Sequence, residues 1–241
     1  VTLAAALTQQ NAEALFAIAL TQLVRPGAPV VYGGFTSNVD MKTGAPAFGT
    51  PENTRANMAG GQLARFYNLP YRTSACSASN AADAQAVWET QMALWGAVTG
   101  HGNLVYHAAG WGEGGLVADF EKLVIDCEML QAMAAMLRPV GFDTADFGFS
   151  AHDEVDPGGH FFGTAHTMER YQDAFYAPFL SDWSNHENWR DAGSKTATTR
   201  AMALWPRMLD AYTLPPMDAG RIEEMQAYIA HRKEQIGSDT P

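Results

Sequence analysis

One order of elements repeats along the chain: a helical pattern, a short β-rich run and then a loop. The helical patterns cover residues 3–23, 50–67 and 83–98, and the β-rich runs that follow them cover residues 29–32, 71–76 and 104–108. Strands separated by helices pair in parallel through right-handed crossovers, which gives a doubly wound sheet or a (β/α)8 barrel. No GxGxxG or P-loop pattern follows any of these runs. The order therefore favours the barrel.

A further helix is predicted from Phe120 to about Leu137, because its apolar residues keep one face until Pro139. The aromatic and histidine-rich passage from Phe142 to Tyr176 contains no strand that we can place. Charged helices are expected near 196–212 and 218–236.

A closed barrel needs eight strands, and only three are indicated here. The predicted fold class is therefore α/β, as half of a (β/α)8 TIM-type barrel with additional C-terminal helices. Residues 1–140 would form a half-barrel of βα units. Residues 141–241 would supply the barrel closure and the C-terminal helical region of the same domain.

The composition excludes several classes of function. A formal net charge of -11 would repel nucleic acid and an anionic membrane surface. Two cysteines are too few for a disulfide framework, which favours a reducing cytoplasm. Polar residues interrupt the apolar stretch from Leu3 to Leu23, so we predict neither a membrane span nor a signal peptide. The chain enters a helical pattern directly from Val1, which we interpret as a cut end.

Several short runs resemble, in order, the trimethylamine methyltransferase family, in the branch that lacks pyrrolysine. The runs are Val1–Ala4, Gln10–Ala14, Arg25–Gly34, Met41–Gly44, Gly49–Glu52, Asp83–Ala86 with Glu89, Asp126–Glu128, Asp156–Phe161 and His166–Thr167. Together they cover nearly the whole chain. The resemblance implies a barrel roughly twice this length, of which this chain would be the C-terminal half.

The resemblance also implies a reaction. Members of the family move a methyl group from an N-methylated amine to the cobalt of a corrinoid that a small partner protein carries. Pyrrolysine would lie on the loop near Ser77–Asn80 in the trimethylamine branch, and this chain has ordinary residues there. The implied substrate is therefore a quaternary amine similar to glycine betaine. The implied cofactor is the partner's corrinoid, and no tightly bound metal is expected.

Active sites of such barrels lie on the loops after the carboxyl ends of the strands. The aromatic faces there would attract a methylated ammonium group. The candidate substrate-binding residues at these ends are Tyr32, Phe35, Asn80, Tyr106 and Trp111. Alternatively, Tyr32 or Tyr106 fills the barrel or the helix layer.

His107 is the candidate catalytic residue, because it ends a strand beside the glycine-rich loop 110–115 and could orient a substrate carboxylate. The alternative is a structural histidine that is hydrogen-bonded in the barrel mouth. Gly159 and His160 are the candidates for contact with the corrinoid.

A metal site is the competing interpretation of the histidine-rich passage. His152, Asp153, Glu154, Asp156, His160 and His166 are competent ligand types. Their spacing matches no HExxH pattern, and Pro157–Gly159 places a turn among them. The alternative functions are thus a metal-dependent barrel hydrolase or lyase, and an inactive fragment of the methyltransferase. An open half-barrel has unpaired strand edges, so we expect a homo-oligomer or association with a missing N-terminal half.

Overall fold

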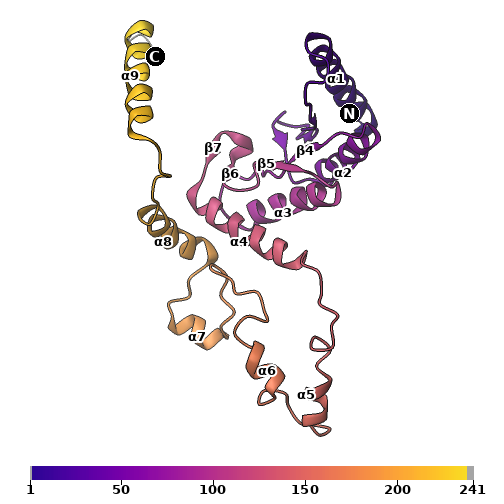
Figure 1. The fold of residues 1–241 in the computed structure, drawn as a ribbon, viewed down its shortest axis with the longest axis vertical. Helices are drawn as coiled ribbons and strands as arrows, with labels where there is room; N and C mark the ends of the chain where they lie inside the picture. Colours follow the sequence, from indigo (N-terminus) through magenta and orange to yellow (C-terminus); the bar gives the residue numbers. More distant parts are fainter. Residues whose placement is uncertain (1, 238–241) are drawn as a thin grey trace. The chain divides into compact units, whose positions relative to one another are not determined.

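The structure is a computed structural model that describes residues 2–237 (Figure 1). The chain divides into two compact units, Val1–Trp205 and Pro206–Pro241. The first unit contains every strand of the described residues. The boundary between the two units lies in the C-terminal helical region.

The predicted alternation of helices and strands is confirmed. The helices α1 (Leu3–Val24), α2 (Pro51–Phe66), α3 (Ala84–Thr99) and α4 (Phe120–Met136) alternate with the strands β1 (Tyr32–Gly33), β4 (Tyr71–Ser74) and β5 (Leu104–Tyr106). Thr50 caps α2 by accepting a hydrogen bond from the Asn53 amide, with Pro51 at the first helical position. Asp83 caps α3 by accepting from the amides of Gln85 and Ala86. These side chains fix where both helices begin.

The three strands form one parallel sheet in the order β1-β4-β5. Tyr32 pairs with Tyr71, and Arg72 pairs with Leu104. Since side chains alternate along a strand, Tyr71 points to the layer of α1 and α2, whereas Arg72 points to the opposite face. Leu104 and Tyr106 on that opposite face remain 43% and 46% exposed. A three-stranded parallel α/β sheet is therefore established, with one face packed on helices.

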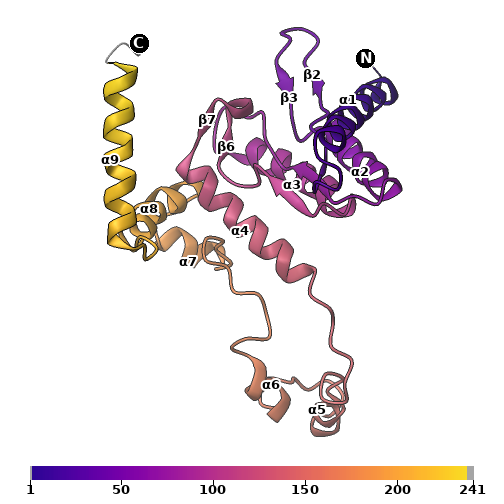
Figure 2. The same cartoon turned by 45° about the horizontal axis from the view of Figure 1, so that its top comes forward.

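Two hairpins occupy the loops after β1 and β5, where the sequence pattern indicated no strands. One pairs β2 (Asn38–Val39) with β3 (Pro46–Ala47), and the other pairs β6 (Trp111–Gly112) with β7 (Val117–Ala118) around the 3₁₀ turn η1 (Glu113–Gly115). Figure 2 shows the first hairpin beside α1, and residues of β2 line a shared pocket with the start of that helix. Both hairpins follow strands of the parallel sheet, so they lie on the side where the strands end.

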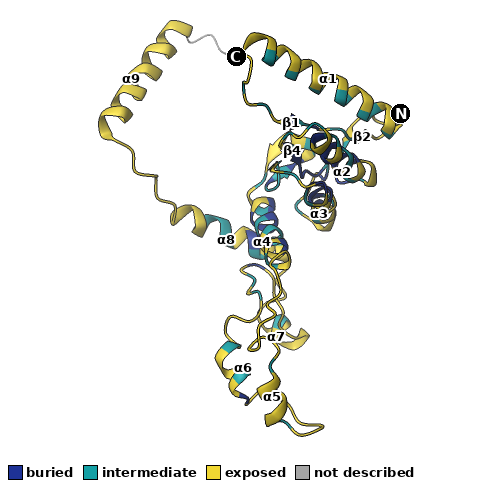
Figure 3. Ribbon diagram, turned by 45° about the vertical axis from the view of Figure 1, so that its right-hand side comes forward, coloured by how far each residue is buried: buried dark blue, intermediate teal, exposed yellow. Residues whose placement is uncertain are grey.

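The core lies between α2, α3 and the sheet, where the buried residues concentrate (Figure 3). Small residues let the two helices meet closely, because a Cβ at Gly61 would clash with the Gly100 carbonyl oxygen and one at Gly96 would lie 2.7 Å from the Thr54 oxygen. Asn57 crosses this contact and donates to the carbonyls of Ser74 and Ala93. The helix pair is therefore built for close backbone approach.

The later part of the first unit consists of helices and loops in the described residues. Its helices are α5 (Phe149–Glu154), α6 (Ala165–Arg170), α7 (His186–Asp191) and the start of α8 (Ala197–Asp210). The Glu128 carboxylate joins this part to α4 by accepting from the Tyr176 hydroxyl and the amides of Phe179 and Leu180. Past Ala118 the described residues form no strand, so barrel closure by residues 141–241 stays a prediction.

The second unit contains α9 (Ala219–Ile236), which begins at the capping residue Asp218. Its side chains are exposed. Across residues 2–237, no helix combines the length and the apolar character that crossing a membrane requires.

Candidate functional site

Five rings gather where β1 and β5 end, and we call them the aromatic cluster: Phe35, Phe48, Tyr106, His107 and Trp111. His107 is at its centre, with ring centroids 4.1 Å from Trp111, 5.6 Å from Phe35 and 5.7 Å from Tyr106. Phe48 closes the group at 5.2 Å from Phe35 and 6.2 Å from Trp111. Four of the predicted site residues therefore lie together at the carboxyl ends of the strands.

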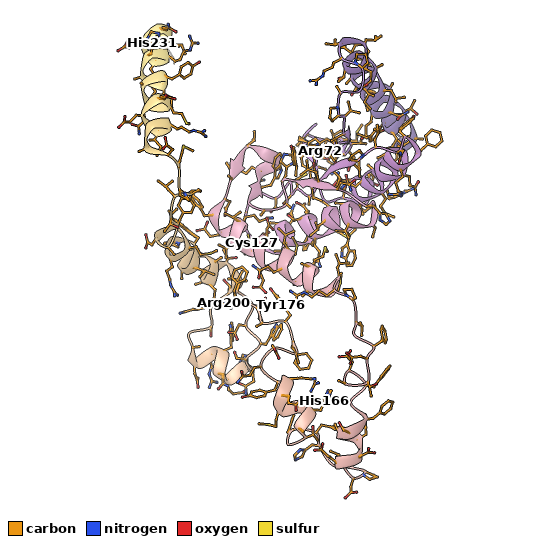
Figure 4. All side chains as sticks on the ribbon, viewed as in Figure 1. Arg72, Cys127, His166, Tyr176, Arg200 and His231 are labelled. Atoms are coloured by element: carbon orange, nitrogen blue, oxygen red, sulfur yellow. The ribbon has the colours of Figure 1, made fainter. Side chains whose placement is uncertain are left out.

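Arg72 brings a positive charge to the aromatic cluster (Figure 4). Its guanidinium carbon lies 4.4 Å from the centroid of the Tyr106 ring and 5.7 Å from that of Phe35. The guanidinium donates a long hydrogen bond of 3.5 Å to the Gly34 carbonyl. Because a guanidinium carries five N–H groups, Arg72 retains donors for an anionic ligand.

Two ring nitrogens of the aromatic cluster are buried without a hydrogen-bond partner among the described residues: Nδ1 of His107 and Nε1 of Trp111. Burial, with a smaller contribution from the Arg72 charge, lowers the pKa of His107 below its ordinary value. His107 is therefore a neutral imidazole near pH 7. Unpartnered buried polar atoms cost free energy, so a ligand that pairs with them would gain affinity.

His107 also has a strained backbone. Its φ angle is 61°, a left-handed conformation that residues other than glycine rarely adopt, and Glu113 has a φ angle of 52°. Strain of this kind persists only where the surrounding structure holds it, and it is frequent at functional sites. The left-handed conformation of His107 turns the chain sharply from β5 into the loop that carries Trp111.

A buried ion pair anchors this loop. The Lys122 ammonium lies 2.5 Å from the Asp126 carboxylate and donates to the Thr90 hydroxyl at 2.7 Å. Asp126 accepts in turn from the Gly110 amide at 2.9 Å. Burial raises the pKa of Asp126, and the Lys122 charge opposes that shift. The run Asp126–Glu128, which resembles the family in sequence, thus contains two residues that anchor loops. Asp126 holds the loop at Gly110, and Glu128 holds the segment near Tyr176.

Asn80 is exposed and lies on the rim of a small cavity of about 30 Å³ that Trp111 and Glu113 also line. The volume suits one water molecule at most. The structure thus brings Asn80 close to the Trp111 loop, although its side chain is not part of the aromatic cluster.

Tyr32 lies elsewhere, in the helix layer. It is fully buried against Tyr67 and Tyr71, and its hydroxyl donates to Asn11 of α1. Because Tyr32 pairs with Tyr71, both rings point to the helix side of the sheet. The structure therefore gives Tyr32 the packing role that the sequence left open as its alternative.

Gly159 and His160 are exposed in the segment between α5 and α6, where the His160 ring lies 5.3 Å from Phe162. They are not among the residues that form the aromatic cluster. His152 contacts Phe161, at 5.1 Å between ring centroids. Within the described part of the chain, no group of three or more His, Cys, Asp or Glu side chains could hold a metal ion.

Phe48 and Arg72 were not among the residues predicted for the site. Phe48 returns to Phe35 only because the β2–β3 hairpin folds the loop back, and the two-residue strands leave no alternation to detect. Arg72 offered a signal, since a charge in the middle of a short β-rich run must point away from the packed face.

The fold and the site define an α/β protein that presents aromatic rings and a cation at the carboxyl ends of parallel strands. Residues 1–237 match the family model described as trimethylamine methyltransferase. The chain belongs to this family.

Three curated relatives illustrate the match. The chain is 35% identical to the glycine betaine methyltransferase of Desulfitobacterium hafniense strain Y51, over 98% of this chain and 50% of that protein. It is 30% identical to a trimethylamine methyltransferase of another strain of that species, over 98% of this chain and 48% of the relative. It is 32% identical to a trimethylamine methyltransferase of Methanosarcina barkeri, over 94% of this chain and 46% of that relative. The chain spans about half the length of the curated relatives it matches.

Proposed function

We propose that this chain carries the substrate site of a corrinoid-dependent methyltransferase. The enzyme would transfer a methyl group from a quaternary or tertiary methylamine similar to glycine betaine to Co(I) of a corrinoid on a small partner protein. The observation that carries the proposal is the convergence of Arg72 with the aromatic cluster at the ends of the strands. Family membership supports the same reaction.

The aromatic cluster suits a methylated ammonium group. Each good contact between such a cation and a ring contributes about 0.5 to 2 kcal/mol. Since Arg72 already covers Tyr106 and approaches Phe35, and Phe48 is buried, the rings left for a ligand are those of His107 and Trp111. The ammonium group would bind at that end of the aromatic cluster.

Arg72 favours a substrate that also bears a carboxylate. A bare ammonium ion near the guanidinium would be repelled, whereas a carboxylate could accept charge-assisted hydrogen bonds worth about 1.5 to 3 kcal/mol each. Nε1 of Trp111 offers a further donor, and Nδ1 of His107 offers one in the tautomer that carries the proton on that atom. Among quaternary amines, the site therefore favours a betaine over choline.

Losing a methyl group from a quaternary ammonium releases a neutral amine, so no general acid is needed. The chain's own task is to bind the cation, orient one methyl group and exclude water. When bound, the corrinoid would supply the strong cobalt nucleophile that accepts the methyl group. The residues of the site fit this division of labour, because a carrier protein would hold the corrinoid and Tyr106, which is 46% exposed, would leave an approach to the aromatic cluster. Gly159 and His160 remain the proposed contacts for the corrinoid or its carrier.

We further propose that the three-stranded sheet is part of a (β/α)8 barrel, with this chain as the C-terminal half. The half-length match to the relatives and the exposed sheet face at Leu104 and Tyr106 support this arrangement. The free strand edges would then be paired by a complementary half or by another copy of the chain.

The test is methyl transfer to free cob(I)alamin from glycine betaine, carnitine, choline and trimethylamine, followed by the change in cobalamin absorbance. The chain is assayed alone and after mixing with the N-terminal half of the glycine betaine methyltransferase of strain Y51. We expect transfer from betaines in the mixture. No transfer from any amine, together with stoichiometric bound zinc or iron, would support the metal-dependent alternative. No transfer and no metal would support the inactive fragment.

A further inference from the structure

We propose that Glu89 is a positioning residue that holds together the three loops that bear the aromatic cluster and its rim. The inference rests on the proposed function for the identity of the ligand. The loops follow β1, β4 and β5, and Glu89 lies in the first half of α3. Glu89 contacts the first two loops directly, and the third is hydrogen-bonded to Ser79 of the second loop.

The carboxylate of Glu89 holds the loop after β4. Its Oε2 atom accepts from the Ser77 hydroxyl at 2.8 Å, from the Ala78 amide at 2.8 Å and from the Ser79 amide at 2.9 Å. Its Oε1 atom accepts from the Gln85 side chain at 2.8 Å. The backbone of this loop therefore surrounds an anion that the protein itself supplies.

The backbone of Glu89 supports the loop after β1. Gly49 directly follows Phe48 of the aromatic cluster, and a Cβ at Gly49 would clash with the Glu89 backbone. Gly49 has a φ angle of 67°, so this position requires glycine for its conformation as well as for its space. The close approach fixes where Phe48 leaves the hairpin.

The third loop is joined through Ser79. The Ser79 carbonyl accepts from the Glu113 amide at 2.9 Å. Glu113 follows Trp111 by two residues and has one of the left-handed backbone conformations of its loop. Holding Ser79 therefore also holds the turn that directs Trp111 into the aromatic cluster.

A role in proton transfer is not favoured for Glu89. Its Oε2 atom already accepts three hydrogen bonds and its Oε1 atom accepts one, all from groups of the loop after β4 and of α3. A charged acceptor that satisfies three loop donors is expensive to remove, because those donors would lose their partner. Glu89 therefore acts on the ligand through the loops.

The experiment uses the whole chain with Glu89→Gln, which keeps the side-chain shape and removes the charge. Gln85→Ala is the matched control, because it removes only the Oε1 partner. Gly61→Ala controls for lost stability alone, since Gly61 packs against Gly100 far from these hydrogen bonds. Hydrogen exchange of the Ala78, Ser79 and Glu113 amides reports on the loops, calorimetric titration with glycine betaine reports on the site, and thermal unfolding reports on stability.

In Glu89→Gln we expect the three amides to exchange about tenfold faster and betaine to bind about tenfold more weakly. Amide exchange and betaine binding should both change little in Gln85→Ala. Gly61→Ala should lower the stability of the chain and leave betaine binding unchanged. Unchanged amide exchange in Glu89→Gln would overturn the proposal, as would faster exchange with unchanged binding. If Glu89→Gln does not fold, Glu89→Asp, which keeps the charge on a shorter side chain, replaces it with the same expectations. If the parent chain binds no betaine, the proposed function fails, whereas the amide exchange still decides whether Glu89 holds the loops.

Discussion

The guanidinium of Arg72 rests on the ring of Tyr106, with 4.4 Å between the guanidinium carbon and the ring centroid. The parallel register explains the contact, because Arg72 pairs with Leu104 and Tyr106 follows two residues later on the same face. Within residues 2–237, no carboxylate lies within ion-pair distance of Arg72. The site therefore presents a cation that an aromatic ring orients and that lacks an acidic partner in the described residues.

Replacing Arg72 by lysine should weaken the binding of glycine betaine about tenfold or more. Lysine keeps the positive charge but loses the planar group that stacks on the ring and binds a carboxylate through two parallel hydrogen bonds. Calorimetric titration of both proteins with glycine betaine and with choline is the measurement. Choline, which has no carboxylate, should bind the variant no worse than the parent. Equal losses for the two ligands would show that Arg72 does not select the carboxylate.

The pKa of His107 should lie below its ordinary value of 6.5, because burial and the Arg72 charge both disfavour the imidazolium form. The chain has seven histidines, so ¹³C-labelled imidazoles can be titrated by NMR and His107 assigned from the missing signal in His107→Gln. Arg72→Met should raise this pKa toward 6.5. A His107 pKa of 6.5 or more in the parent chain would contradict the expectation.

The same pKa shift predicts how stability depends on pH. In the window just below pH 6.5 the unfolded chain binds a proton at His107 and the folded chain does not. The free energy of unfolding should therefore fall as the pH decreases through this window, and His107→Gln should remove that part of the decrease. Urea unfolding of both proteins at several pH values between 5 and 8 measures the difference.

Local sequence patterns predicted the helices and the three parallel strands, because each depends on periodicity and caps within a few residues. Thr50 and Asp83 begin their helices as the sequence indicates. The two hairpins were not predictable from periodicity, since strands of two residues show no alternation. The face on which Tyr32 lies could not be read from alternation either. It depends on the pairing with Tyr71 and on the contact with Asn11, both of which are far away in the sequence.

The candidate site was predictable in part for the same reason. Rings at strand ends, such as His107 and Trp111, could be found because strand ends are visible in the sequence. Side chains that anchor loops from a helix could not be found in this way. Glu89 accepts a hydrogen bond from the Ser79 amide, 10 residues earlier in the chain, and Asp126 accepts one from the Gly110 amide, 16 residues earlier. In the sequence, Glu89 and Asp126 stand out only because their runs resemble the family, and the structure gives both residues a physical role as loop anchors.

Lys122→Met should destabilise the fold by about 3 to 5 kcal/mol, because it leaves the carboxylate of Asp126 buried without its cation. The side chains of Lys122 and Asp126 are 2% and 1% exposed, so water cannot replace the lost partner. Urea denaturation measures the change. Arg170→Met is the control: it removes the cation of the more exposed pair with Glu169 and should cost about 1 kcal/mol or less. Similar losses in both variants would mean that the buried pair is not a special anchor.

Gly61→Ala should destabilise the chain by about 1 to 3 kcal/mol, because an added methyl group would enter the space of the Gly100 carbonyl and push α2 from α3. A helical glycine in open space would instead gain from alanine, since alanine has the higher helix propensity. The sign of the change therefore distinguishes close packing from propensity. Gly163→Ala controls for an added methyl group in open space, because Gly163 lies in a turn and a Cβ there would meet nothing within 4 Å. Thermal and urea unfolding of the two variants measure the difference, and a Gly61→Ala protein as stable as the parent would contradict the close approach of the two helices.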